Sequence, residues 1–186
     1  QWQGIDDTDA NASLTPTGDT AFVAVFAPVV DISIIPPLVA QDTTLAAAAS
    51  PWYGLEDVLI LPGARLTVEA GATLLLTDGV CFDVQGGLVF NGTEEDRISV
   101  GSDPAPTARR SFYGRSGKWG SIHADSPTDS INIHYTDLRS GSFGRDRATH
   151  YSTISTYNTT IQVEGSTITE GLAPFIARGG SAHIAG

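Results

Sequence analysis

The chain has 186 residues, of which 41% are hydrophobic and 17% charged, and this composition excludes an intrinsically disordered protein. A net charge of -11 excludes nucleic acid as a partner, because a phosphate backbone would be repelled over most of the surface. No apolar run approaches the roughly 18 residues of a transmembrane helix, so we expect no membrane insertion, and the single cysteine, Cys81, excludes an intrachain disulfide.

Residues 1–26 end in a strand signal. In TAFVAVF, Phe22 and Phe26 alternate with Val23 and Val25, and the Thr-Gly-Asp sequence just before is typical of a turn. The pattern W-x-G, an acidic turn and then T-x-x-G-D-T-x-F-x-A-V-F resembles the closing strands of the internalin-type B-repeat, an extracellular bacterial β module. This resemblance implies that residues 1–26 are the end of a small β module.

Residues 27–57 are rich in proline, which blocks a continuous helix and confines strands to short or edge positions. The prolines are Pro28, Pro36, Pro37 and Pro51. We predict a Pro-rich joint that serves as the N-terminal cap, with Trp52 and Tyr53 covering the open end of the following domain.

From Val58 onwards, short apolar strands alternate with glycine-containing turns, and the pattern repeats. Leu66 and Val68 correspond to Leu88 and Phe90, an offset of 22 residues, and we align Leu74 with Ile98 through a two-residue insertion. A fixed period of this length indicates a solenoid whose coils stack on one another, although a closed barrel of similar strands is an alternative.

The repeat continues in the later half of the chain. Ile133 aligns with Val163 at an offset of 30 residues, which falls to about 21 if residues 142–150 form an inserted loop. Leu138 aligns with Ile168, and Ile184 follows Val163 by 21 residues. Residues 58–186 therefore supply roughly five coils, and we expect the stack to be incomplete at its C-terminal end.

PGARLTVEAGATLLL, VQGGLVFNGTEEDRISV and KWGSIHADSPTDSINIHYTDLRSG resemble the opening coils of a right-handed parallel β-helix from large secreted or surface bacterial proteins. The resemblance implies an all-β solenoid with coils of about 22 residues, at the cell surface or outside the cell. Because SAHIAG ends in mid-coil and would leave an apolar end exposed, we expect partners that cover it, namely further coils or domains of the same polypeptide or copies of the same chain.

Enzymes with this fold use clustered acids, and two groups are candidates: Asp125, Asp129 and Asp137, and the turn residues Glu94, Glu95 and Asp96. Neither group has the D-x-D-x-D-G spacing of a calcium loop.

His123 and His134 each follow an isoleucine in a strand segment, so we expect outward-facing histidines rather than a zinc site. We therefore predict no catalytic residue, no metal site and no cofactor.

Two excursions from the repeat, at 108–119 and 141–151, combine arginines with aromatic residues, a combination that suits sugars or anionic groups. The alternative is that both pair with a neighbouring domain or with the acidic N-terminal half, where residues 1–96 hold 14 acids and one base, Arg65. The predicted binding residues are Arg109, Arg110, Phe112, Tyr113, Arg115, Trp119, Arg145, Arg147 and Tyr151.

Together these features predict a non-enzymatic structural or adhesive module, a stiff spacer or binding surface within a larger surface protein, with polysaccharide as a candidate ligand. The alternative is the N-terminal part of a β-helical carbohydrate-active enzyme, either a polysaccharide lyase or a glycoside hydrolase. The fold itself does not decide between them, because the same coil carries both kinds of function.

Overall fold

The computed structural model describes residues 32–103, 117–143 and 152–186, all of which belong to one unit, 32–186. The β module predicted for residues 1–26 lies outside the described residues. Within the described ranges, eighteen strands form three parallel sheets of six, and Ala47–Ala49 form a short 3-10 helix, η1. No helix in these ranges is long and apolar enough to cross a lipid bilayer.

We call the three sheets I, II and III. Sheet I contains β1 (Ser33–Ile34), β4 (Trp52–Gly54), β7 (Thr73–Leu76), β10 (Ile98–Ser102), β13 (Thr136–Arg139) and β16 (Thr167–Thr169). Sheet II contains β2 (Leu38–Val39), β5 (Val58–Ile60), β8 (Phe82–Val84), β11 (Ile122–Ala124), β14 (Ile154–Tyr157) and β17 (Phe175–Arg178). Sheet III contains β3 (Thr43–Leu45), β6 (Arg65–Glu69), β9 (Gly87–Asn91), β12 (Ser130–His134), β15 (Thr160–Glu164) and β18 (Ser181–Ala185).

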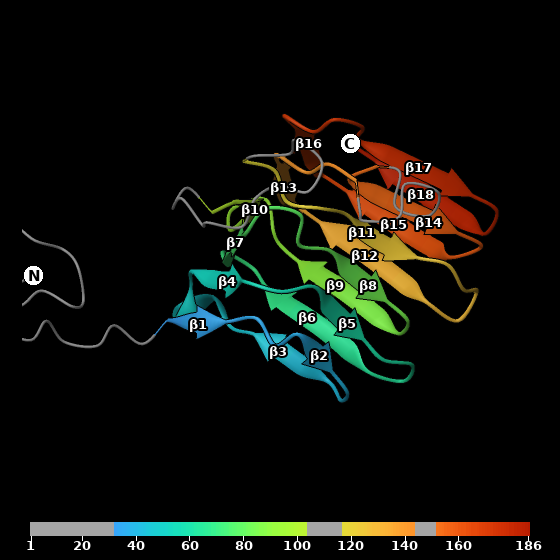
Figure 1. The fold of residues 1–186 in the computed structure, drawn as a ribbon. Coiled ribbons are helices and arrows are strands. Elements are labelled where there is room, and N and C mark those ends of the chain that lie inside the picture. The colour runs from blue at the N-terminus through green and yellow to red at the C-terminus, as the bar shows by residue number, and fades with distance from the viewer. Residues whose placement is uncertain (1–31, 104–116, 144–151) are drawn as a thin grey trace, which may run out of the picture. The chain divides into compact units, whose positions relative to one another are not determined.

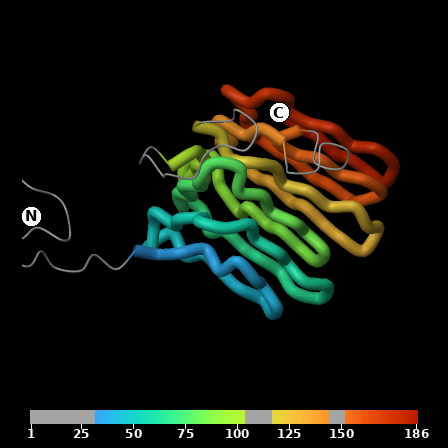
Figure 2. The backbone as a smooth tube through the Cα atoms, viewed as in Figure 1, coloured from blue at the N-terminus to red at the C-terminus, as the bar shows by residue number. Residues whose placement is uncertain are grey.

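The chain visits the three sheets in turn, and each strand from β1 to β15 pairs in parallel with the strand three places further along. Each round is one coil, and Figures 1 and 2 show the coils stacked from the blue to the red end of unit 32–186. The predicted parallel β-helix is confirmed, and the alternative of a single closed barrel is wrong, because the strands belong to three separate sheets.

The register of the coils follows the apolar repeat at most of the positions aligned from sequence. Leu66 pairs with Leu88 and Val68 with Phe90, as predicted. The predicted pairs Ile133 with Val163, Leu138 with Ile168 and Val163 with Ile184 are also present. The recurring spacing of the apolar residues therefore aligned these strands correctly.

The alignment of Leu74 with Ile98 is wrong, because Leu74 pairs with Val100. The extra residues lie in the turn before β10, where the Asp96 amide donates to Thr93 Oγ1 at 3.0 Å. A shift of two residues leaves the same side chains pointing inward, so Ile98 and Val100 fit the apolar pattern equally well.

The first coil begins before Val58, within the segment for which the sequence predicts a joint. Strands β1 to β4 pair in register with β4 to β7. Trp52 pairs with Leu74 in sheet I, packs against the core and donates through Nε1 to Ala46 O at 2.9 Å. The prolines fit this coil because Pro36 and Pro51 lie just outside strands, where no ladder hydrogen bond is lost.

Inward side chains form one continuous hydrophobic core inside the coil. Neighbouring members of the core interlock rather than merely stack, as Phe82 and Phe90 do with an edge-on contact of 6.5 Å between ring centroids. Cys81 is buried, as its place in an apolar run predicts. Outward positions between the core residues are left to carry polar side chains, so a functional site would be built from these positions.

Candidate functional site

The binding residues predicted from the two excursions are described at one position, Trp119. The other eight lie outside the described residues and stay predictions: Arg109, Arg110, Phe112, Tyr113, Arg115, Arg145, Arg147 and Tyr151.

Trp119 lies in the core, in contrast to the ligand-facing position expected for it. Its side chain is fully buried, its Nε1 donates to Arg139 O at 2.6 Å, and its backbone amide donates to Ser102 Oγ at 3.1 Å. The indole therefore stabilises the coil where the chain returns to it, and it presents no surface to a ligand.

The acids singled out from the sequence lie in different parts of the coil. Asp125 and Asp129 share the turn between β11 and β12, whereas Asp137 lies in β13 of sheet I. Asp129 is 3% exposed and accepts a hydrogen bond from the Ser126 amide at 3.0 Å, and burial raises the pKa of its carboxyl above the ordinary value. This geometry makes Asp129 a turn-closing residue.

Asp137 forms a bidentate ion pair with Arg97, with Nη2 to Oδ1 at 2.7 Å and Nε to Oδ2 at 3.2 Å. Arg97 Nη1 donates to Gly165 O at 2.8 Å, and Thr167 Oγ1 donates to Asp137 Oδ1 at 2.7 Å. Hydrogen bonds from Arg97 hold the pKa of the Asp137 carboxyl below its ordinary value, and Asp137 in turn raises the pKa of Arg97. All three guanidinium nitrogens are used to brace successive coils.

The two histidines considered from the sequence both alternate with inward isoleucines, yet they lie in different sheets. His123 is in β11 of sheet II, is only 4% exposed and packs against the Tyr157 ring at 5.9 Å between centroids. His134 is in β12 of sheet III, and its Nδ1 lies 3.3 Å from Glu164 Oε2 of the next coil. In the part of the chain that the structure describes, no three His, Cys, Asp or Glu side chains are grouped as a metal site.

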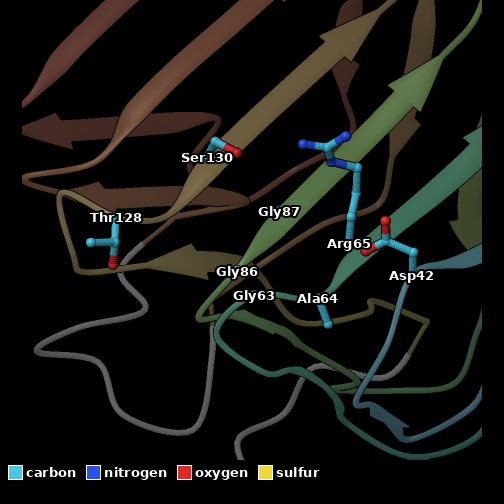
Figure 3. Close-up of a pocket in the computed structure, with 8 residues that line it drawn as sticks. All are labelled: Asp42, Gly63, Ala64, Arg65, Gly86, Gly87, Thr128 and Ser130. Atoms are coloured by element: carbon cyan, nitrogen blue, oxygen red, sulfur yellow. The ribbon is translucent and has the colours of Figure 1, made fainter.

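A polar recess, which we call the Gly87 recess, lies at the turns that lead from sheet II into sheet III (Figure 3). It has a volume of about 240 Å³ and is lined by Asp42, Gly63, Ala64, Arg65, Gly86, Gly87, Thr128 and Ser130. These residues come from four successive coils, so the recess exists only because the coils are in register. The recess is not evident from the sequence, since its members are spread over 89 positions from Asp42 to Ser130.

Gly86 is required by the backbone at the floor of the Gly87 recess. A Cβ atom there would lie 2.3 Å from Ala64 O and 2.4 Å from Leu61 O, far inside the contact distance of real carbon and oxygen atoms. The turn of one coil therefore rests directly on the turn of the coil before it, and the Gly87 amide donates to Ala64 O at 2.9 Å.

Arg65 and Asp42 give the recess its charge. Both residues are exposed, and within the described ranges neither side chain makes an ion pair or a hydrogen bond. Figure 3 shows the Arg65 side chain extended over β9, with the Asp42 carboxylate beside its stem and Ser130 ahead of its guanidinium. The recess thus offers one positive and one negative group to solvent.

Three parallel sheets coiled in register define a parallel β-helix protein. Comparison of this chain with protein-family models, curated proteins and solved structures found no match. The function is therefore inferred from the chain's own residues.

Proposed function

We propose that this chain is a non-enzymatic, extracellular β-helix module that acts as a stiff spacer or binding surface in a larger surface protein. The observation that carries the proposal is the unbroken register of three six-stranded parallel sheets. Bending such a stack would strain backbone hydrogen bonds in at least one sheet, so the fold supports a rigid element.

The use of the acids supports a structural role over a catalytic one. Asp137 is held by Arg97 and Thr167, and Asp129 closes a turn within its own loop. A glycosidase needs two carboxyl groups facing one bond at a separation of about 5 to 9.5 Å. Asp129 instead lies in the turn before β12 and Asp137 within β13, each engaged with its own partners.

Exposed apolar side chains at both ends of the stack support association with further coils, further domains or copies of the same chain. Ile34 and Leu38 are 46% and 54% exposed in the first coil, and Ile184 is 61% exposed in β18. Large apolar side chains beside unpaired strand edges favour coverage by another protein surface.

The likeness of residues 1–26 to a B-repeat supports an extracellular or cell-surface location. The two excursions that combine arginines with aromatic residues support polysaccharide as a ligand.

Two measurements on the full chain test this proposal. Stretching single molecules by atomic force microscopy is expected to unfold the stack in coil-sized steps, and smooth extension at low force would contradict the spacer role. Incubation with neutral and acidic polysaccharides is expected to release no reducing ends and no unsaturated products. Turnover that disappears in Asp125→Asn or Asp137→Asn would establish the enzyme alternative.

A further inference from the structure

Strands β6, β9, β12, β15 and β18 of sheet III begin at the same register position, and this position forms a column across the coils. Its members, in order, are Arg65, Gly87, Ser130, Thr160 and Ser181. Further along the column, Ser181 Oγ donates to Thr160 Oγ1 at 3.2 Å, so these two adjacent members meet. Gly87 has no side chain, and the Gly87 recess is the gap that this leaves between Arg65 and Ser130.

The backbone does not require glycine at position 87, in contrast to position 86. A Cβ atom on Gly87 would meet only side-chain atoms, at 3.3 Å from Arg65 Nε and 3.5 Å from Ser130 Oγ. Arg65 is exposed and flexible enough to yield by a few tenths of an ångström. A Cβ atom at Gly87 would therefore lie against the Arg65 and Ser130 side chains and not against backbone, so the backbone of the coil does not by itself require the recess between these two side chains.

The opposite charges of the recess do not neutralise each other. Arg65 and Asp42 lie side by side in Figure 3, yet they form no ion pair, and Ser130 Oγ makes no hydrogen bond within the described ranges. The guanidinium presents several donors suited to a carboxylate, and the carboxylate of Asp42 presents acceptors suited to an ammonium group. Two complementary half-sites are therefore available within one recess.

The size and lining of the recess exclude large ligands, stacked sugar rings and simple ions. At about 240 Å³ it is smaller than the roughly 300–1,000 Å³ of sites for drug-sized ligands. No aromatic side chain lines it, so a sugar ring has no face on which to stack. A simple anion would be repelled by Asp42 and by the chain's net charge of -11, whereas a simple cation would face Arg65.

We infer that the Gly87 recess binds a small zwitterion of the α-amino-acid type. The ligand carboxylate accepts hydrogen bonds from the Arg65 guanidinium and the Ser130 hydroxyl, and its ammonium group donates to the Asp42 carboxylate. This binding site goes beyond the proposed spacer role and does not depend on it, since the recess is formed by the coils whether or not the module carries a load.

Nuclear magnetic resonance titration of the full chain tests the site with glycine, acetate and methylammonium as probes. Glycine is expected to shift the Gly86 and Gly87 amide signals and the Arg65 Nε–H signal in a saturable way. Acetate and methylammonium, which each carry one charge, are expected to bind about tenfold more weakly, the loss of one charge-assisted hydrogen bond. Equal binding of acetate and glycine, or no saturable shift with glycine, would overturn the inference.

Single substitutions identify the residues that hold the probe. Arg65→Gln and Asp42→Asn are each expected to weaken glycine binding about tenfold, and Gly87→Val is expected to abolish it by filling the gap. Arg178→Gln and Thr160→Val are the matched controls, because they remove a charge and a hydroxyl from sheets II and III outside the recess. If Gly87→Val does not fold, Arg65→Gln and Asp42→Asn still test the site. Unchanged glycine affinity in both of these variants contradicts it.

Discussion

The N-terminal and C-terminal coils share one architecture but fill their interiors differently. In β5 to β9 every inward side chain is apolar, whereas in β11 to β16 threonine replaces an aliphatic residue at two inward positions. Thr136 follows Ile98 in one column, and Thr156 follows Val84 and Ala124 in another. The backbone register is therefore maintained even where the core changes from purely apolar side chains to ones that include hydroxyl groups.

The two threonines also differ from each other. Thr136 Oγ1 donates to His134 O at 2.8 Å, so its buried hydroxyl is satisfied. Thr156 Oγ1 is buried and has no hydrogen-bond partner within the described ranges. A hydroxyl is therefore tolerated in this interior at low cost only where a backbone carbonyl lies within reach.

The largest expected effect comes from opening the apolar interior of the N-terminal coils. Phe90→Ala removes a fully buried ring that packs edge-on against Phe82, and we expect a loss of about 3–5 kcal/mol in the free energy of unfolding. Urea unfolding followed by circular dichroism measures it. A loss below about 1 kcal/mol would mean that these coils are not tightly packed.

The contact between successive turns gives the next largest effect. Gly86→Ala forces a Cβ atom against Ala64 O and Leu61 O, and we expect destabilisation by about 1–3 kcal/mol. Gly87→Ala is the matched control, and it should change stability by less than about 0.5 kcal/mol. Equal effects of the two substitutions in the same urea experiment would contradict the register at these turns.

The ion pair that braces the C-terminal coils is expected to contribute about 1–2 kcal/mol, because its groups are partly exposed. Asp137→Asn should lower stability by this amount at neutral pH. Since the folded state lowers the pKa of Asp137, the contribution is present above the ordinary aspartate pKa of about 3.9 and is lost as the pH falls through the folded value.

Asp129 provides the control of opposite sign for that experiment. Its pKa is raised by burial, so its contribution is largest in acid and is lost as the pH rises through the folded value. Stability measured from neutral pH into acid should therefore diverge between Asp137→Asn and Asp129→Asn. Parallel pH profiles for the two variants would contradict the assigned environments.

The smallest effect comes from the unsatisfied hydroxyl. Thr156→Val keeps the shape of the side chain and removes a buried group that has no partner, so we expect stabilisation by about 1 kcal/mol. The reverse exchange in the same column, Val84→Thr, should destabilise by a similar amount. Destabilisation by Thr156→Val in thermal unfolding would show that this hydroxyl is bonded in solution.

Much of the fold could be predicted because in most strands every second residue faces the core and is apolar, which gives the sequence a period of two. That signal located the pairs Leu66 with Leu88 and Ile133 with Val163. It could not distinguish Ile98 from Val100 as the partner of Leu74, since a shift of two residues preserves the buried face. The same apolar pattern did not reveal the coil that begins before Val58, because its strands are very short and the prolines between them are typical of a linker.

The candidate site was less predictable, for a different physical reason. The Gly87 recess is defined by a missing side chain and by charges from separate coils, and neither is visible before the register is known. Trp119 was placed among ligand-binding residues because arginines surround it in the sequence, but an indole can equally fill a core if its N–H finds an acceptor. Arg139 O supplies that acceptor.

Disulfide formation between Asn132→Cys and Gln162→Cys tests the central claim, the in-register parallel stack, most directly. These outward residues pair across β12 and β15, and paired strands lie about 4.8 Å apart, which suits a disulfide. We predict rapid, nearly complete crosslinking under mild oxidation, with Cys81 too buried to compete. Efficient crosslinking of Asn132→Cys with Glu164→Cys instead, with none to position 162, would contradict the register on which the whole account depends.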